Sequence, residues 1–146
     1  LTAHKVKSLY ALVMELYIVL GNAVASTWRT EADLAPLLVV QQQLQANAVN
    51  EDIDAFVESS FDVMRAAFLF ANNPYLQETL ENLLPAISRT YHLALGRRKS
   101  EMNTLVNSFA SLLQAVIARD LPQIRAILLG YGQHNCALVL AALAER

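Results

Sequence analysis

The chain has 146 residues, the size of one ordinary domain, which is long enough to bury a hydrophobic core. Hydrophobic residues make up 55% and charged residues 16%, so we expect a cavity, a partner interface, a lipid-like ligand or simply a compact helical core. A net charge of −2 without a large basic patch argues against nucleic-acid binding, and the single cysteine, Cys136, excludes an internal disulfide and favours a reducing compartment, the cytoplasm.

The first predicted helix runs from Lys5 to Ala25, where apolar residues recur every three or four positions on more than one side. Glu15 interrupts its longest apolar run, and no stretch reaches about 18 uninterrupted apolar residues, so we expect no membrane span. A second helix is predicted from Thr30 to about Ala48, opening with a capping-box pattern. Pro36 lies one turn into it and predicts either a bend or a later start.

The third helix is predicted within DAFVESSFDVMRAAFLFANNPYL, residues 54–76, whose apolar spacing gives a wide buried stripe. We expect the chain to enter it through Asn50 as the capping residue, followed by an acidic first turn. The helix should end before Asn73, because Pro74 disfavours helical geometry at the residue before it and is well placed to begin a new helix.

Polar residues lie on this apolar third helix, namely Ser60, Asp62 and Arg65. Charged side chains usually face solvent, which is one interpretation of Asp62 and Arg65. If these groups are buried instead, each must find a partner in the protein or in a ligand.

A fourth helix is predicted from Pro74 to about Leu95, with Gly96 as its C-terminal stop. Pro85 lies inside it and predicts a kink near Glu81, whose carbonyl loses its hydrogen-bond partner. A fifth helix is predicted from about Ser100 to Arg119.

The sixth helix is predicted from Leu121 to Ala144, with Asp120 as its cap. Gly130 and Gly132 fall in its middle, where each costs about 1 kcal/mol relative to alanine. We expect either a close approach by another helix or a ligand, or a kink. No segment has a strand pattern and the connections are short, so the predicted fold is a single all-α domain over residues 1–146, an antiparallel bundle of six to seven helices.

Catalytic and metal-binding motifs are missing from the sequence. There is no glycine-rich phosphate loop, no nucleophile elbow and no His-Glu-x-x-His, so we expect neither an enzyme nor a cofactor. His134 and Cys136 are two residues apart and face different directions on a helix, which suits zinc poorly. His92 is interpreted as a partly exposed histidine rather than a haem ligand.

The third helix and its corner resemble the C-terminal effector domain of GntR-type bacterial transcription regulators, and most closely the FadR branch, which responds to fatty acyl-CoA. The resemblance is carried by Ala55-Phe56, by Arg65 and by the Asn73-Pro74 corner. It continues through VNSFASLLQAVIARDLPQIRAILLGYGQHN, with the Ala-x-x-x-x-Asp step at residues 115–120 and the Tyr-Gly pair at residues 131–132. It covers nearly the whole chain and is weakest in the first helix, at Ala11 and Val13.

The resemblance implies a site between the helices. Most of the wider family binds a divalent metal through an Asp and three His, and the corresponding positions are Ser60, Met64, Phe109 and Tyr131. None of these is a good ligand for zinc or nickel, so the resemblance implies no metal but a greasier cavity for an acyl chain or another amphipathic molecule.

Five residues are the candidate ligand-binding set: Met64, Arg89, Phe109, Tyr131 and Asn135. Met64, Phe109 and Tyr131 are expected to line the cavity, Asn135 to bond a polar part of the ligand, and Arg89 to meet a carboxylate, thioester or phosphate. The FadR branch has a serine where Asn135 stands and a tryptophan where Val139 stands, so the ligand could differ. The alternative is that Met64 and Phe109 are ordinary core and Arg89 is a surface or interface charge.

The resemblance therefore predicts a ligand-sensing and dimerisation module whose effector is an acyl-CoA, a fatty acid or an organic acid. The chain begins at Leu1 rather than at methionine, which fits a segment of a longer protein, with a winged-helix DNA-binding domain expected upstream. DNA binding would then require that upstream domain, and no membrane partner is expected. The alternative is a helical interaction module with no small-molecule ligand, whose surplus apolar surface is an oligomer interface.

Overall fold

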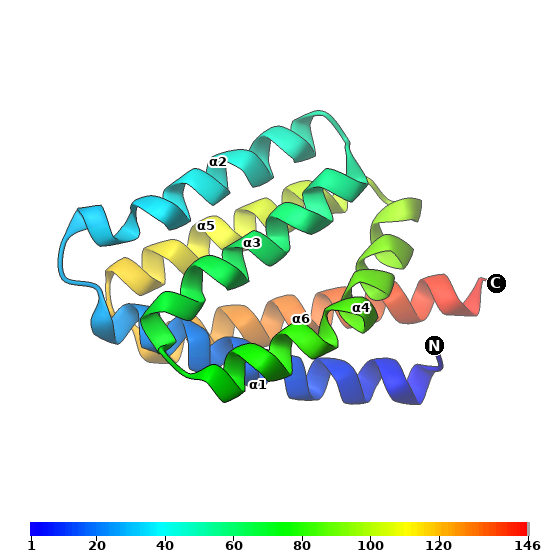
Figure 1. The fold of residues 1–146 in the computed structure, drawn as a ribbon. Helices are drawn as coiled ribbons and strands as arrows, with labels where there is room; N and C mark the ends of the chain where they lie inside the picture. The colour runs from blue at the N-terminus through cyan, green and yellow to red at the C-terminus, as the bar shows by residue number, and fades with distance from the viewer. Residues whose placement is uncertain (146) are drawn as a thin grey trace.

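The computed structural model describes residues 1–145, and in that range the chain is helical throughout, with no β-strand (Figure 1). The elements are α1 (Ala3–Thr27), the short 3₁₀ helix η1 (Glu31–Leu34), α2 (Ala35–Val49), α3 (Ile53–Ala71), α4 (Pro74–Arg97), α5 (Glu101–Ile117) and α6 (Leu121–Ala144). Successive α-helices run in alternating directions (Figure 1). The predicted all-α antiparallel bundle is confirmed.

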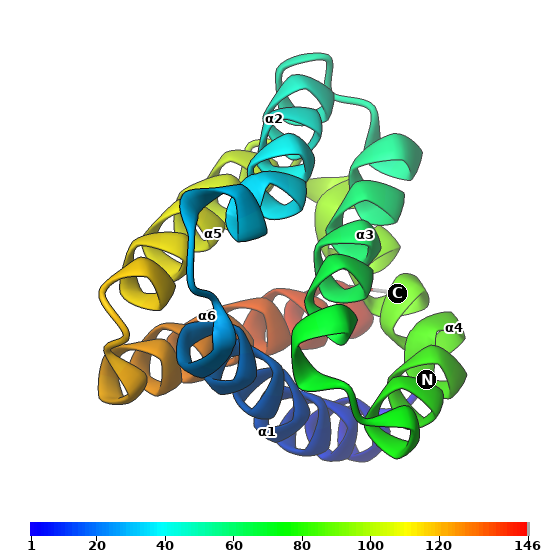
Figure 2. The same cartoon turned by 60° about the vertical axis from the view of Figure 1, so that its left-hand side comes forward.

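Helix α1 is the element that most of the bundle touches. It lies beside α6, and α2, α3 and α5 lie on one side of this pair of helices (Figure 2). Contacts run from α1 to α3, α4, α5 and α6, and α2 closes the remaining side by packing on α3 and α5. The core therefore fills the space between the α1–α6 pair and the other helices, and its fully buried side chains include Leu44, Phe56, Leu80, Met102 and Ile124.

Several helix ends agree with their sequence signals. Helix α6 has the predicted bounds, and the Asp120 carboxylate accepts a hydrogen bond from the Gln123 backbone N–H at 3.1 Å. At the α3–α4 corner, Asn72 adopts a left-handed conformation with a φ of 46°, and the Asn73 side chain accepts from the N–H groups of Tyr75 and Leu76. Pro36 lies in the first turn of α2, after η1, so of the two predicted roles the later start is correct.

Two predicted capping residues are wrong. The cap of α3 is Asp52, whose carboxylate accepts from the Ala55 N–H at 3.1 Å, whereas Asn50 still closes α2. The chain reverses between them at Glu51, which has a φ of 53°. Helix α4 runs through Gly96 to Arg97, because Gly96 does not take the positive φ that makes glycine a helix stop.

The charged residues of α3 face solvent. The Arg65 side chain is 37% exposed and bonds Glu58 at 2.8 Å and Asp62 at 3.1 Å on its own helix. It also reaches Glu81 of α4 at 3.4 Å. Because these pairs are open to water, they stabilise the fold only slightly. Ser60 points the other way, and its hydroxyl donates to the Val57 carbonyl at 2.6 Å.

Helix α4 stays continuous through Pro85 and bends part-way along (Figure 1). A proline removes one backbone hydrogen bond and its ring crowds the preceding turn, which is a sufficient cause for a bend.

Helices α1 and α6 are also long and apolar enough to cross a membrane, judged by length and composition alone. Helices that build a protein core have the same composition, and both helices pack on each other and on further helices of the bundle. The expected lack of a membrane partner therefore stays a prediction.

The approach of α1 to α6 depends on glycine. A Cβ atom at Gly132 would lie 2.4 Å from Cγ and 2.7 Å from Sδ of Met14, and one at Gly21 would lie 2.8 Å from Cγ2 of Ile124. Such distances are far inside van der Waals contact, so close helix packing is the correct explanation for Gly132. Gly130 is exposed and has nothing within 4 Å of its Cβ position.

The two glycines of α6 should therefore respond oppositely to alanine. We expect Gly132→Ala to lower the free energy of unfolding by about 1–3 kcal/mol, because Met14 is buried and must move. Gly130→Ala should raise it by about 0.5–1 kcal/mol, because alanine is the better helix former. Urea unfolding followed by circular dichroism measures both. Equal effects of the two substitutions would contradict the close packing of α1 on α6.

Candidate functional site

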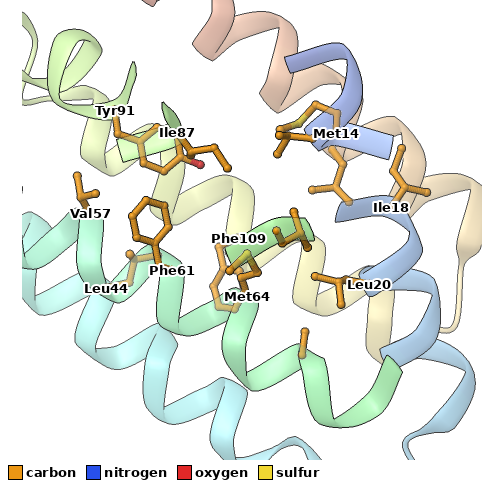
Figure 3. Close-up of a cluster of buried hydrophobic side chains, with 14 of the residues drawn as sticks. Met14, Ile18, Leu20, Leu44, Val57, Phe61, Met64, Ile87, Tyr91 and Phe109 are labelled. Carbon is orange, nitrogen blue, oxygen red and sulfur yellow. The ribbon is translucent and has the colours of Figure 1, made fainter. Parts of the chain in front are cut away.

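A cavity of about 130 Å³ lies in the middle of the bundle, lined by side chains from all six α-helices. Its wall is almost wholly apolar, and Figure 3 shows part of it, with Leu20, Met64 and Phe109 close to one another. None of the residues from 1 to 145 that line it is Asp, Glu, Lys, Arg or His. Its polar side-chain atoms are hydroxyl groups, supplied by Tyr17, Ser60, Tyr91, Ser108 and Tyr131.

Three of the five candidate residues meet in this cavity. Met64 of α3, Phe109 of α5 and Tyr131 of α6 all line it, and so does Ser60. The four positions at which the wider family is expected to carry metal ligands therefore converge on one cavity. Their side chains are two hydroxyls, a thioether and a phenyl ring, which do not suit a divalent metal. No group of three or more His, Cys, Asp and Glu side chains that could hold a metal is found within residues 1–145.

Tyrosines form the polar side of the cavity. The Tyr131 hydroxyl donates a hydrogen bond to the Tyr91 hydroxyl, and the Tyr91 ring stacks on Phe61 with 5.9 Å between the centroids. Burial raises the pKa values of Tyr17, Tyr91 and Tyr131, so all three stay protonated at neutral pH. A neighbouring hydroxyl of Tyr91 opposes this increase in the pKa of Tyr17, but only in part.

Tyr17 and Tyr91 line the cavity but are not among the residues predicted from the sequence. A signal for them exists, because a buried tyrosine needs a partner for its hydroxyl. Tyr10 and Tyr17 are seven residues apart on α1, so they share one helix face. That face points toward α4 and α6, where Thr90, Tyr91 and Asn135 supply further polar groups.

Asn135 lies outside the cavity wall, in a hydrogen-bonded chain that joins α1, α4 and α6. Its amide donates to the Tyr10 hydroxyl, which lies 2.9 Å from Oγ1 of Thr90. Thr90 in turn donates to the carbonyl of Ile87 at 2.7 Å, so the Tyr10 hydroxyl is the donor to Thr90. Burial raises the pKa of Tyr10 to about 12. Each of the three side chains has a hydrogen-bond partner, and Asn135 is buried in the core.

Arg89 is also separate from the cavity. It is exposed on α4, in a surface pocket of about 500 Å³ shared with Lys5 and His92. His92 is half-exposed, as expected, and its Nε2 lies 2.9 Å from the Asp54 carboxylate of α3. A hydrogen bond with the Ser88 carbonyl and the nearby carboxylate raise the pKa of His92. Arg89 therefore lies apart from Met64, Phe109 and Tyr131 in this structure.

Comparison with protein families gives one finding: the family model described as "FCD domain" matches residues 14–133. The matched segment holds every residue that lines the cavity. A comparison with curated proteins found no match.

The Tyr10–Asn135 bond can be tested by a double-mutant cycle. We expect Asn135→Ala and Tyr10→Phe each to lower the free energy of unfolding by about 1–3 kcal/mol, since each leaves a buried polar atom without a partner. Together they should cost less than the sum, with a coupling energy of at least about 0.5 kcal/mol.

Asn107→Ala, at an exposed asparagine of α5, is the matched control and should change stability by less than about 0.5 kcal/mol. Additive effects of Asn135→Ala and Tyr10→Phe in urea unfolding would show that the two side chains do not interact.

Proposed function

The chain belongs to the FCD domain family, the C-terminal effector-binding domains of GntR-type transcription regulators, and from this premise we propose that it senses an amphipathic metabolite in its central cavity. The family is regulatory and not enzymatic. The effector we propose is a fatty acyl-CoA, a fatty acid or a related organic acid. The observation that carries the proposal is the apolar cavity lined by Met64, Phe109 and Tyr131.

The size of the cavity bears on how such a ligand is taken up. Ligand pockets usually measure about 300–1,000 Å³, and this cavity measures about 130 Å³. A long acyl chain would therefore fit only if helices of the bundle separate or if part of the chain lies outside the cavity. In the first case binding would select the open arrangement of the bundle, which is a population shift.

Helix α1 is the element that would transmit this shift. Leu20 and Val24 of α1 line the cavity, and the helix also contacts α3, α4, α5 and α6. In the proposed full-length protein, the winged-helix domain lies upstream of α1, so a movement of α1 changes the placement of that domain. Two copies of the chain would pair as a homodimer, and the spacing of their DNA-binding domains on an operator would depend on the effector. We place the protein in the cytoplasm, with DNA contacted only through the upstream domain.

A second function is a helical interaction module without a small-molecule ligand. The α3–α4 corner favours it, because Leu69 is 82% exposed and Tyr75 is 80% exposed there. Exposed apolar side chains of this size are common at protein interfaces. Dimerisation fits both functions, whereas a ligand in the cavity fits only the first.

The two functions are separated by a cavity-filling variant. Ser108 lines the cavity and Ser111, one turn along α5, is exposed. We expect Ser108→Leu to fold normally and to lose ligand binding, because leucine occupies the space that the ligand needs. Ser111→Leu is the matched control and should bind as the unmodified chain does.

The measurement is native mass spectrometry of the purified chain, with extraction of any bound compound, followed by thermal unfolding with octanoyl-CoA, octanoate or octanol. A ligand at one hundred times its Kd should stabilise the chain by about 2.7 kcal/mol, and Ser108→Leu should abolish that gain. If nothing co-purifies and no compound shifts unfolding of the unmodified chain, the interaction module is the better explanation.

A further inference from the structure

The cavity offers hydroxyl groups but no charge. Its titratable side chains are Tyr17 from α1, Tyr91 from α4 and Tyr131 from α6, and the described parts of α2, α3 and α5 contribute none. The ion cluster around Arg65 lies on the solvent side of α3, and Arg89 lies in a separate surface pocket. No cation is therefore available to neutralise an anion that enters the cavity.

Burial disfavours negative charge at this place. It is the largest cause of the raised pKa of Tyr17, Tyr91 and Tyr131, because each phenolate would lose hydration. A carboxylate that entered the same space would lose its hydration in the same way. Hydrogen bonds from hydroxyls compensate this loss only in part when no positive charge is near.

The tyrosine pair can still recognise a neutral oxygen atom. Tyr131 donates to Tyr91, and both residues line the cavity. In this arrangement a hydroxyl or carbonyl oxygen of a ligand can accept from the Tyr91 phenol, and it can accept from Tyr131 if the ligand oxygen replaces Tyr91 as the acceptor. Met64, Phe109 and Leu113 surround an apolar body. The volume of about 130 Å³ is close to the roughly 150 Å³ of a dry engineered cavity in another protein that binds benzene. A ligand part of about six carbon atoms is therefore the right size.

From these observations we propose that the part of the effector held in the cavity is uncharged and is not a free carboxylate. It combines a small apolar body with one hydroxyl, carbonyl or ester-type oxygen, which Tyr131 and Tyr91 bind. This inference rests on the proposed function, in which the cavity is the effector site. It narrows the ligand class to alcohols, ketones, phenols, esters and thioesters. A carboxylic acid binds only in its protonated form.

The test compares three probes of similar size: toluene, 1-hexanol and hexanoate. Isothermal titration calorimetry at pH 5 and pH 7 measures their dissociation constants with the unmodified chain. We expect the dissociation constant of toluene to be the same at pH 5 and pH 7, and likewise that of 1-hexanol. Hexanoate should bind about tenfold more weakly for each unit that the pH rises, because a carboxylic acid with a pKa near 4.3 loses its neutral form at that rate.

Tyr131→Phe identifies the group that holds the oxygen. It should weaken the binding of 1-hexanol about three- to tenfold, which is the effect of one hydrogen bond between neutral groups. It should leave the binding of toluene unchanged. Tyr75→Phe is the matched control, since Tyr75 is 80% exposed and outside the cavity, and it should change neither probe. Circular dichroism checks that both variants are folded.

The outcomes separate this inference from the proposed function. If hexanoate at pH 7 binds as tightly as 1-hexanol, or if Tyr131→Phe leaves 1-hexanol unchanged, the inference is wrong while the cavity remains a ligand site. If neither toluene nor 1-hexanol binds, and Ser108→Leu changes nothing, the cavity is not a ligand site and the proposed function fails with the inference.

Discussion

The close contact of α1 with α6 is the constraint on which the rest of the structure depends. Gly132 lets the Met14 side chain lie directly against the backbone of α6. In the same way, Gly21 lets the Ile124 side chain lie against the backbone of α1. Because each glycine costs helix stability, the gain must come from the packing it permits. The α1–α6 pair then presents one continuous surface, on which α3, α4 and α5 pack.

Polar interactions link this pair to the other helices near both of its ends, and they differ in chemistry between the two ends. Toward one end, the buried chain from Asn135 through Tyr10 to Thr90 joins α1 and α6 to α4. Toward the other end, the Arg119 guanidinium lies 4.0 Å from the Trp28 ring centroid, and the Trp28 indole N–H donates to the Val116 carbonyl at 3.2 Å. Directional bonds fix both ends, whereas the contacts around the cavity between them are mostly apolar, with the Tyr131–Tyr91 hydrogen bond on its polar side. Packing around the cavity can therefore change without breaking the hydrogen bonds at either end.

Local signals in the sequence were sufficient to predict most of the helices. Asp120, Asn73 and Pro74 act within one turn of themselves, so their effects can be derived without knowing the fold. The error at Asn50 has a local cause too, because Asp52 is an equally good cap two residues later and only the backbone at Glu51 decides between them.

The site was predictable only in part, and the reason is sequence distance. Helical spacing and the family resemblance placed Met64, Phe109 and Tyr131 on inward faces, and those faces do meet. The partner of Asn135 is Tyr10, which is 125 residues away, and the partner of Tyr131 is Tyr91, 40 residues away. No periodicity within one helix encodes such pairs. Arg89 has a chemistry that suits an anion, but it is exposed on α4 in a pocket separate from the cavity, which no pattern within one helix indicates.

The same positions explain why this cavity differs in chemistry from a metal-dependent one. A metal ion would bring positive charge into the bundle and so allow a carboxylate to be buried beside it. Ser60, Met64, Phe109 and Tyr131 supply no ligand set for such an ion, and no basic side chain within residues 1–145 takes its place in the cavity. What remains is a set of hydroxyls held neutral by burial in an apolar chamber. The uncharged character inferred for the bound part of the ligand therefore depends on which residues occupy these four positions, whereas the packing of α1 on α6 through Gly21 and Gly132 does not involve them.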